Sequence, residues 1–458
     1  MGIKNRLTLM SFLQFFVWGA WLITIANYWF GTKNWEGTQF GLVFSTMGIA
    51  SLFMPTLTGI IADRWINAEK LYGVLHILYG CVLFYLPEVT TPTTFIYIML
   101  VAMCFYMPTI ALSNSISYNA LKTNGLDVVK SFPPIRVFGT IGFIVAMWIT
   151  NLTGNKATAY QFYIAGVAAI LLGLYAFSLP KCKPQRLIKE NASWMETMGL
   201  ESFKLFANYK MALFFIFSMF LGGALQLTNA YGDVFLDEFK HFPKYADSFV
   251  VEYSTIIMSI SQISETLFIL AIPFFLKRFG IKQVMLISML AWVLRFGLFS
   301  FGNPTDGLWM IILSCIVYGM AFDFFNISGS LFVETHTDAK NRSSAQGMFM
   351  MMTNGVGAIL GSFTSGWAID RFFTKSFGTT KELASFLETE NTNPNMLEFV
   401  KSQGKVISTD GLLDSALLMK DWHTIWLAFA IYSLIIAIAF AVMFKHDHDP
   451  NEVENVNH

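Results

Sequence analysis

Residues 316–334 read I-V-Y-G-M-A-F-D-F-F-N-I-S-G-S-L-F-V-E, and the interpretation of the whole chain starts from this stretch. It is long and apolar enough to cross a bilayer as a helix, yet Asp323 stands near its middle. A carboxylate at that depth is energetically expensive, so it usually faces water, a partner or a substrate. The stretch therefore predicts a membrane-spanning helix that carries a functional acid.

An ideal helix would divide this stretch into two faces. Asp323 shares roughly 140° of arc with Tyr318, Phe322 and Asn326, whereas apolar side chains occupy the opposite side. The polar face suits a binding site. A buried polar cluster that only locks helices together is the alternative, and this pattern alone does not exclude it.

The composition places the chain among membrane proteins. Hydrophobic residues make up 55% and charged residues 13%, against about 25% charged in soluble domains. The formal net charge is zero, which gives no sign of a nucleic-acid partner. The four cysteines have no C-x-x-C spacing, so we expect them to serve core packing rather than disulfides or a metal site. We also expect no cofactor.

Twelve apolar runs of about 18 to 26 residues predict an all-α membrane protein. The predicted spans are 8–29, 39–62, 70–87, 93–117, 134–152, 159–179, 210–232, 250–276, 283–301, 308–332, 343–368 and 422–444. A polar stretch with a basic cluster separates the sixth span from the seventh. We therefore expect two six-helix bundles, 1–180 and 210–445, a cytoplasmic linker at 181–209 and a polar cytoplasmic tail at 446–458.

Basic residues predict the orientation. With both termini inside, the inside segments hold roughly 18 Lys and Arg, and the outside segments roughly 4 once the long loop 371–421 is discounted. We therefore expect both termini in the cytoplasm. The loop contains helix-like pieces, 381–387 and 396–401, and is interpreted either as an outside cap or as a solvated insertion.

Weak matches between the halves indicate a duplicated unit. Tyr106 and Asn114 correspond to Tyr318 and Asn326, whereas Asp323 corresponds to Ala111, so the acid exists in one half only. Substrate sites in duplicated transporters lie near the bilayer midplane between the repeats. Glycines in the fifth and eleventh spans are expected to serve close helix packing; they are Gly139, Gly142, Gly355, Gly357, Gly361 and Gly366.

Other spans carry polar residues at helical spacing. Arg136, Thr140 and Phe143 share one face, as do Gln226 and Asn229. Gln262 and Glu265 belong to a polar arc in the eighth span. Amides suit a base or an amide-like ligand, and phenyl rings offer faces for stacking.

The two acids are the candidates for proton coupling, because a buried carboxyl gains or loses its proton when its surroundings change. Phenylalanines flank Asp323, whereas Glu265 lies among hydroxyls and one turn from Gln262. We therefore expect Asp323 to be the main proton carrier and Glu265 mainly a substrate ligand. Arg295 is expected to play a structural role and to snorkel to the outer end of its span.

Six runs closely resemble the bacterial nucleoside:proton symporters of the major facilitator superfamily, and the resemblance covers nearly the whole chain. They are S-F-L-Q-F (11–15), W-G-A-W-L (18–22), F-P-P-I-R-V-F-G-T-I-G-F (132–143), S-I-S-Q-I-S-E-T-L-F-I-L (259–270), Y-G-M-A-F-D-F-F-N-I-S-G-S (318–330) and S-A-Q-G-M-F-M-M-M-T-N-G (344–355). The superfamily signature after the second span is only partly kept, since Ile66 stands where glycine is usual. The loop 371–422 is also longer than we expect for the family.

This resemblance implies twelve helices in two bundles, alternating access and proton-driven nucleoside uptake across the bacterial inner membrane. It also implies which residues form the nucleoside pocket: Arg136, Thr140, Phe143, Gln226, Asn229, Gln262, Glu265, Tyr318, Phe322 and Asp323. The expected partners are a nucleoside, protons and the lipid bilayer, and the chain is expected to be a monomer.

Three other functions remain to be weighed. A proton-coupled symporter of another polar solute, such as a sugar, would need groups that match hydroxyls and could spare the stacking phenyls. A membrane receptor that binds without transport should lack the duplicated halves. An enzyme is disfavoured, because no nucleotide-binding loop, metal-ligand cluster or nucleophile–base motif stands out.

Overall fold

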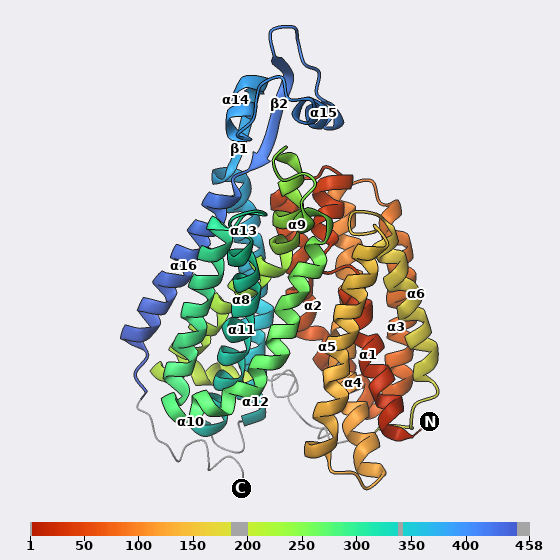
Figure 1. Ribbon diagram of the computed structural model, residues 1–458. Coiled ribbons are helices and arrows are strands. Elements are labelled where there is room, and N and C mark those ends of the chain that lie inside the picture. The colour runs from red at the N-terminus through yellow and green to blue at the C-terminus, as the bar shows by residue number, and fades with distance from the viewer. Residues whose placement is uncertain (1, 185–199, 338–341, 447–458) are drawn as a thin grey trace.

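The computed structural model describes residues 2–184, 200–337 and 342–446, and two helical bundles stand side by side in it (Figure 1). The first bundle contains α1 (Ile3–Gly19), η1 (Asn27–Thr32), α2 (Gly37–Arg64), α3 (Ala68–Tyr85), η2 (Leu86–Glu88), α4 (Pro92–Thr123), α5 (Val128–Leu152) and α6 (Tyr160–Ala176). The second contains η3 (Leu200–Ala207), α8 (Tyr209–Asp237), η4 (Glu238–His241), α9 (Phe249–Glu252), α10 (Ser254–Phe301), α11 (Leu308–His336), α12 (Arg342–Met350), η5 (Met351–Gly357), α13 (Ala358–Phe372) and α16 (Trp422–Met443).

All twelve predicted spans coincide with helical segments. Eight described helices are individually long and apolar enough to cross a membrane. One of them, α10, joins two spans, because Gly280 turns the chain with a φ of +77° that favours glycine. The shorter α6 and two interrupted spans, α1 with η1 and α12 with η5 and α13, supply the rest. The predicted all-α architecture of twelve spans in two bundles is therefore confirmed.

Glycine contacts bear out the expected close packing. A Cβ atom on Gly142 of α5 would lie 2.1 Å from the backbone oxygen of Phe12 in α1. One on Gly361 of α13 would lie 2.2 Å from the Cα atom of Gly223 in α8. Neither position has room for a side chain, so these helices approach backbone to backbone.

The loop between α13 and α16 forms a folded cap, defined here as residues 374–420. Strands β1 (Thr374–Thr379) and β2 (Leu412–Lys420) pair antiparallel, with α14 (Thr380–Phe386) and α15 (Pro394–Ser402) between them in sequence. The predicted helical pieces are thus confirmed, and the strands are new. The cap has a small apolar core of its own that includes Leu383 and Met396, so it is not merely a solvated insertion.

The cap is anchored on the second bundle. Lys420 forms a salt bridge with Glu238 of η4 at 2.8 Å, and Trp422 Nε1 donates a hydrogen bond to the same carboxylate at 2.6 Å. The rings of Phe399 and His241 stack with their centroids 4.1 Å apart. Residues 185–199 of the predicted linker and 447–458 of the predicted tail lie outside the described residues.

The two bundles contact each other at the end that carries the cap. Trp148 of α5 donates a hydrogen bond to Ser259 of α10 at 2.8 Å, and Asn151 Nδ2 donates to the backbone oxygen of Glu252 at 2.9 Å. Lys156 forms a salt bridge with Asp237 of α8 at 2.7 Å. We call these contacts the cap-end interface. They join the two bundles at that end.

Candidate functional site

The ten predicted site residues lie on four helices that meet where the bundles face each other. Helix α5 contributes from the first bundle, and α8, α10 and α11 contribute from the second. Helix α10 packs against all three others. The structure therefore gathers residues that are up to 187 positions apart in the sequence, from 136 to 323.

Aromatic residues of α1 support the α5 group. The guanidinium of Arg136 lies 4.0 Å from the ring centroid of Phe15, which is a cation–π contact. The ring of Phe143 meets Trp18 edge to face at 6.1 Å. Close packing of α1 against α5 at Gly19 and Gly142 makes these contacts possible, so Arg136 and Phe143 sit on a rigid wall.

On α11, the site residues form a short stack. The rings of Tyr318 and Phe322 are stacked at 6.1 Å, as expected for residues four apart on a helix. Trp292 meets Tyr318 edge to face at 5.9 Å. Asp323 follows directly, and its side chain is buried.

Three charged residues follow one another in space from the first bundle to the second: Arg136, Glu265 and Asp323. Glu265 interacts electrostatically with Arg136 of the first bundle and with Asp323 of its own bundle. The Oδ2 atom of Asp323 is buried and has no hydrogen-bond partner within the described part of the chain. Glu265 therefore has a cation nearby, whereas the neighbour of Asp323 is another acid.

Two amides present unused acceptors. The Oε1 atoms of Gln226 and Gln262 are both buried and without a hydrogen-bond partner in the described ranges. Buried polar atoms in native proteins are normally hydrogen-bonded, so such exceptions need an explanation. A polar ligand between α8 and α10 would provide the missing donors. Asn229 on α8 and Thr140 on α5 are partly exposed.

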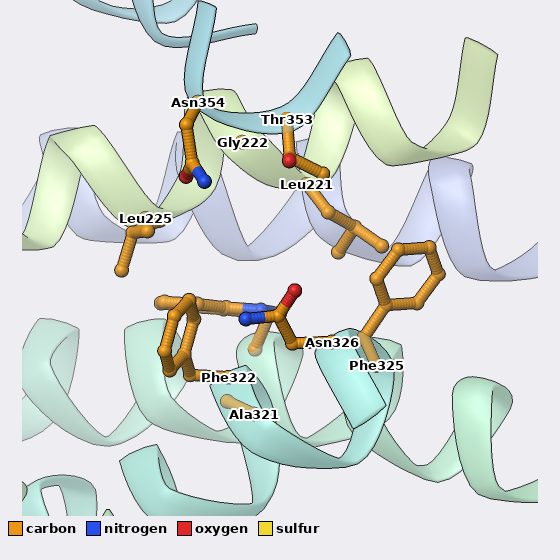
Figure 2. A pocket seen from close by; sticks show the side chains of 10 residues that line it. Leu221, Gly222, Leu225, Ala321, Phe322, Phe325, Asn326, Thr353 and Asn354 are labelled. Carbon is orange, nitrogen blue, oxygen red and sulfur yellow. The ribbon is translucent and has the colours of Figure 1, made fainter. Parts of the chain in front are cut away.

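A pocket open to solvent lies beside Phe322, between α8, α11 and η5, and its empty space, open solvent included, amounts to about 320 Å³ (Figure 2). Phe322 is the single predicted site residue in its lining. The other lining residues are Leu221, Gly222, Leu225, Trp292, Ala321, Phe325, Asn326, Thr353 and Asn354. Sequence reasoning placed Asn326 on the polar face of its helix but gave Asn354 no role.

Arg295 differs from its prediction. Its side chain is fully buried rather than snorkelling toward a membrane surface. Its Nη1 donates a hydrogen bond to the backbone oxygen of Ser314 at 2.7 Å, and its guanidinium lies 4.6 Å from the ring centroid of Tyr318. Arg295 does not snorkel because neighbouring helices of the second bundle enclose it. Its contact with Tyr318 is consistent with the structural role expected for it.

Comparisons with known proteins agree with this architecture. A family model described as "Nucleoside H+ symporter" matches residues 1–389. The xanthosine permease of Escherichia coli (strain K12) is 48% identical over 99% of both chains. Nucleoside permease NupG of the same organism is 45% identical over 100% of both chains. A crystal structure of a variant of nucleoside transporter NupG, also 45% identical, superposes with a TM-score of 0.85 and covers 97% of this chain and 100% of that one.

Proposed function

This chain belongs to the nucleoside H⁺ symporter family, and we propose that the ten residues gathered on α5, α8, α10 and α11 are its nucleoside and proton site. The protein is a multi-pass inner-membrane transporter that couples nucleoside import to proton entry, and not an enzyme. Family membership decides against the sugar symporter and the receptor that the sequence left open.

The observation that carries the proposal is that charged residues of both bundles lie near Glu265. This residue interacts with Arg136 across the interface and with Asp323 within its own bundle. A nucleoside bound there would contact both bundles at once, as alternating access requires. The unpartnered oxygens of Gln226 and Gln262 would accept hydrogen bonds from it.

The surroundings of the two acids support different roles. Arg136 provides an opposite charge near Glu265, which suits the role of a substrate ligand. Asp323 lies near Glu265, and its buried Oδ2 accepts no hydrogen bond from the residues described. A buried acid without such support is suited to binding and releasing a proton. We therefore assign the proton mainly to Asp323.

The closed cap-end interface gives the transport state. Passage from that end is blocked by Trp148–Ser259, Asn151–Glu252 and Lys156–Asp237. With the termini in the cytoplasm, as the basic residues predict, the cap lies outside and this state faces inward.

Uptake of labelled uridine tests the proposal. The chain is expressed in cells that lack their own nucleoside permeases, and uptake is measured with and without a protonophore. We expect accumulation above the outside concentration that disappears when the protonophore is added. Uptake at an unchanged accumulation ratio after full collapse of the pH gradient and membrane potential would contradict proton coupling.

A further inference from the structure

We infer that the pocket between α8, α11 and η5 is a nucleobase subsite, in which Asn326 and Asn354 bind the edge of the base and Phe322 contacts its face. We call it the amide pocket. The inference rests on the proposed nucleoside site and assigns two residues beyond the ten predicted ones. It also divides the ligand, placing the base toward η5 and the ribose toward α10.

The two asparagine amides face each other across the pocket (Figure 2). Asn326 makes no side-chain hydrogen bond within the described residues, and Asn354 Nδ2 has only the Met350 sulfur at 3.9 Å. A thioether is a weak acceptor. Both amides therefore retain their donors and acceptors for a ligand. Each amide can match the adjacent donor and acceptor of a base edge in one plane.

The remaining walls suit a flat, largely apolar group. Leu221 and Leu225 of α8 line one side, and Phe322 and Phe325 of α11 line the other. A base would contact these walls with its faces and place its polar edge on the amides. A ribose would bring several hydroxyls against leucine and phenylalanine, where they would remain unpaired at a cost.

The backbone of η5 fixes the position of Asn354. This segment is a π-helix, a rare conformation that often marks functional sites. It is held against α8 at two points. A Cβ atom on Gly222 would lie 2.0 Å from the backbone oxygen of Thr353, and one on Gly357 would lie 2.3 Å from that of Met219. Asn354 thus projects from a rigid support rather than from a mobile loop.

The amide pocket adjoins the proposed site at Phe322, which belongs to both. It is lined by α8 and α11, the helices that also carry Gln226 and Asp323. A nucleoside with its base in the pocket would therefore direct its ribose toward Gln226 and α10. This arrangement gives the hydroxyls polar partners and leaves the base to the amides.

Transport of nucleoside analogues tests the inference. Asn326→Leu and Asn354→Leu keep nearly the same side-chain size and remove the amide. Each should raise the half-saturation concentration for uridine by about 5- to 150-fold, the range for a lost buried hydrogen bond. Asn395→Leu, at an exposed position in the cap, is the matched control and should not change it.

Two substrate-preference ratios, one for the base and one for the ribose, show which part of the nucleoside the asparagines contact. The preference for uridine over 3-methyluridine, which lacks one base N–H, should fall toward one in the asparagine variants. The preference for uridine over 2′-deoxyuridine should stay as in the wild type. An unchanged base ratio, or a fall in the ribose ratio instead, would overturn the assignment.

Two further measurements separate the possible failures. If a leucine variant does not reach the membrane, Asn326→Ser and Asn354→Ser are assayed instead, with uridine binding to the purified protein measured by thermal shift. The same base ratio decides the outcome. A wild-type protein that transports no nucleoside would refute the proposed function itself. A protein that transports uridine but shows an unchanged base ratio in the asparagine variants would refute only the base subsite.

Discussion

Replacement of Lys156 by methionine should open the cap end of the molecule. Lys156 lies in the turn between α5 and α6, and its ammonium reaches the second bundle. It forms a salt bridge with Asp237 at 2.7 Å and donates hydrogen bonds to the backbone oxygen of Val251 and, at 3.1 Å, to Ser254 Oγ. Because these contacts cross between bundles, they exist only while that end is closed.

The free-energy cost to the closed state depends on which partners Asp237 keeps after Lys156 is replaced. Removing one member of a buried ion pair costs about 3–5 kcal/mol when the other charge is left unpaired. Asp237 keeps Lys240 at 2.6 Å, so the lower range for a charged hydrogen bond, about 1.5–3 kcal/mol, applies. The open state should therefore gain roughly 10- to 150-fold in population relative to the closed state.

Lys240→Met is the matched control. Lys240 pairs with the same carboxylate but belongs to the same bundle, three residues further along the chain. Its contact does not cross the interface, so its loss should leave the balance between open and closed states nearly unchanged.

Pulsed EPR measures the distance between spin labels on Thr153 and Asp247. These two exposed positions lie on opposite sides of the cap-end interface. We expect a second, longer distance in Lys156→Met that is absent from Lys240→Met. The reasoning is refuted if Lys156→Met keeps the wild-type distance distribution, or if both variants shift it equally.

Three further predictions concern the site. Nucleoside added to de-energised cells should alkalinise the medium as protons enter with it, which a pH electrode records; a flat trace would exclude symport. Asp323→Asn should lose uphill accumulation but keep nucleoside binding with weakened pH dependence, whereas Glu265→Gln should lose affinity while residual transport stays proton-linked. Binding measured against pH, with counterflow in vesicles, separates these two, and the opposite pattern would reverse the assignment. Gln226→Ala, Asn229→Ala and Phe143→Ala should each weaken binding about 5- to 150-fold at normal expression; near-native affinity in all three would remove this face from the site.

The membrane spans could be predicted because their signal is local. Apolar length alone identifies a helix that crosses a bilayer, and the helical period places Asp323, Tyr318 and Phe322 on one side of α11. The structure keeps Tyr318 and Phe322 stacked as that period requires. The turn at Gly280 between the eighth and ninth spans is equally local, since a positive φ favours glycine.

Features that depend on tertiary contacts could not be predicted. Arg136 and Glu265 lie near each other although they belong to different bundles, and no periodicity within either helix predicts that proximity. Arg295 is buried because other helices surround it, although its place in the span predicted snorkelling. The role inferred for Asn354 depends on the π-helical turn of η5 against α8, and the quoted run S-A-Q-G-M-F-M-M-M-T-N-G reads as ordinary helix.

The order of the charged groups bears on how proton and nucleoside movements are coupled. Arg136 belongs to the first bundle, whereas Glu265 and Asp323 both belong to the second. A rocking of the bundles would change the separation of Arg136 from Glu265, and Coulomb energies depend steeply on distance where water is scarce. Such motion would alter the net charge that Asp323 faces even though Asp323 keeps its own neighbours. A nucleoside bound between Arg136 and Glu265 would act on the same electrostatic interaction, so the proton site would respond to the substrate through one intervening carboxylate, without rearrangement inside the second bundle.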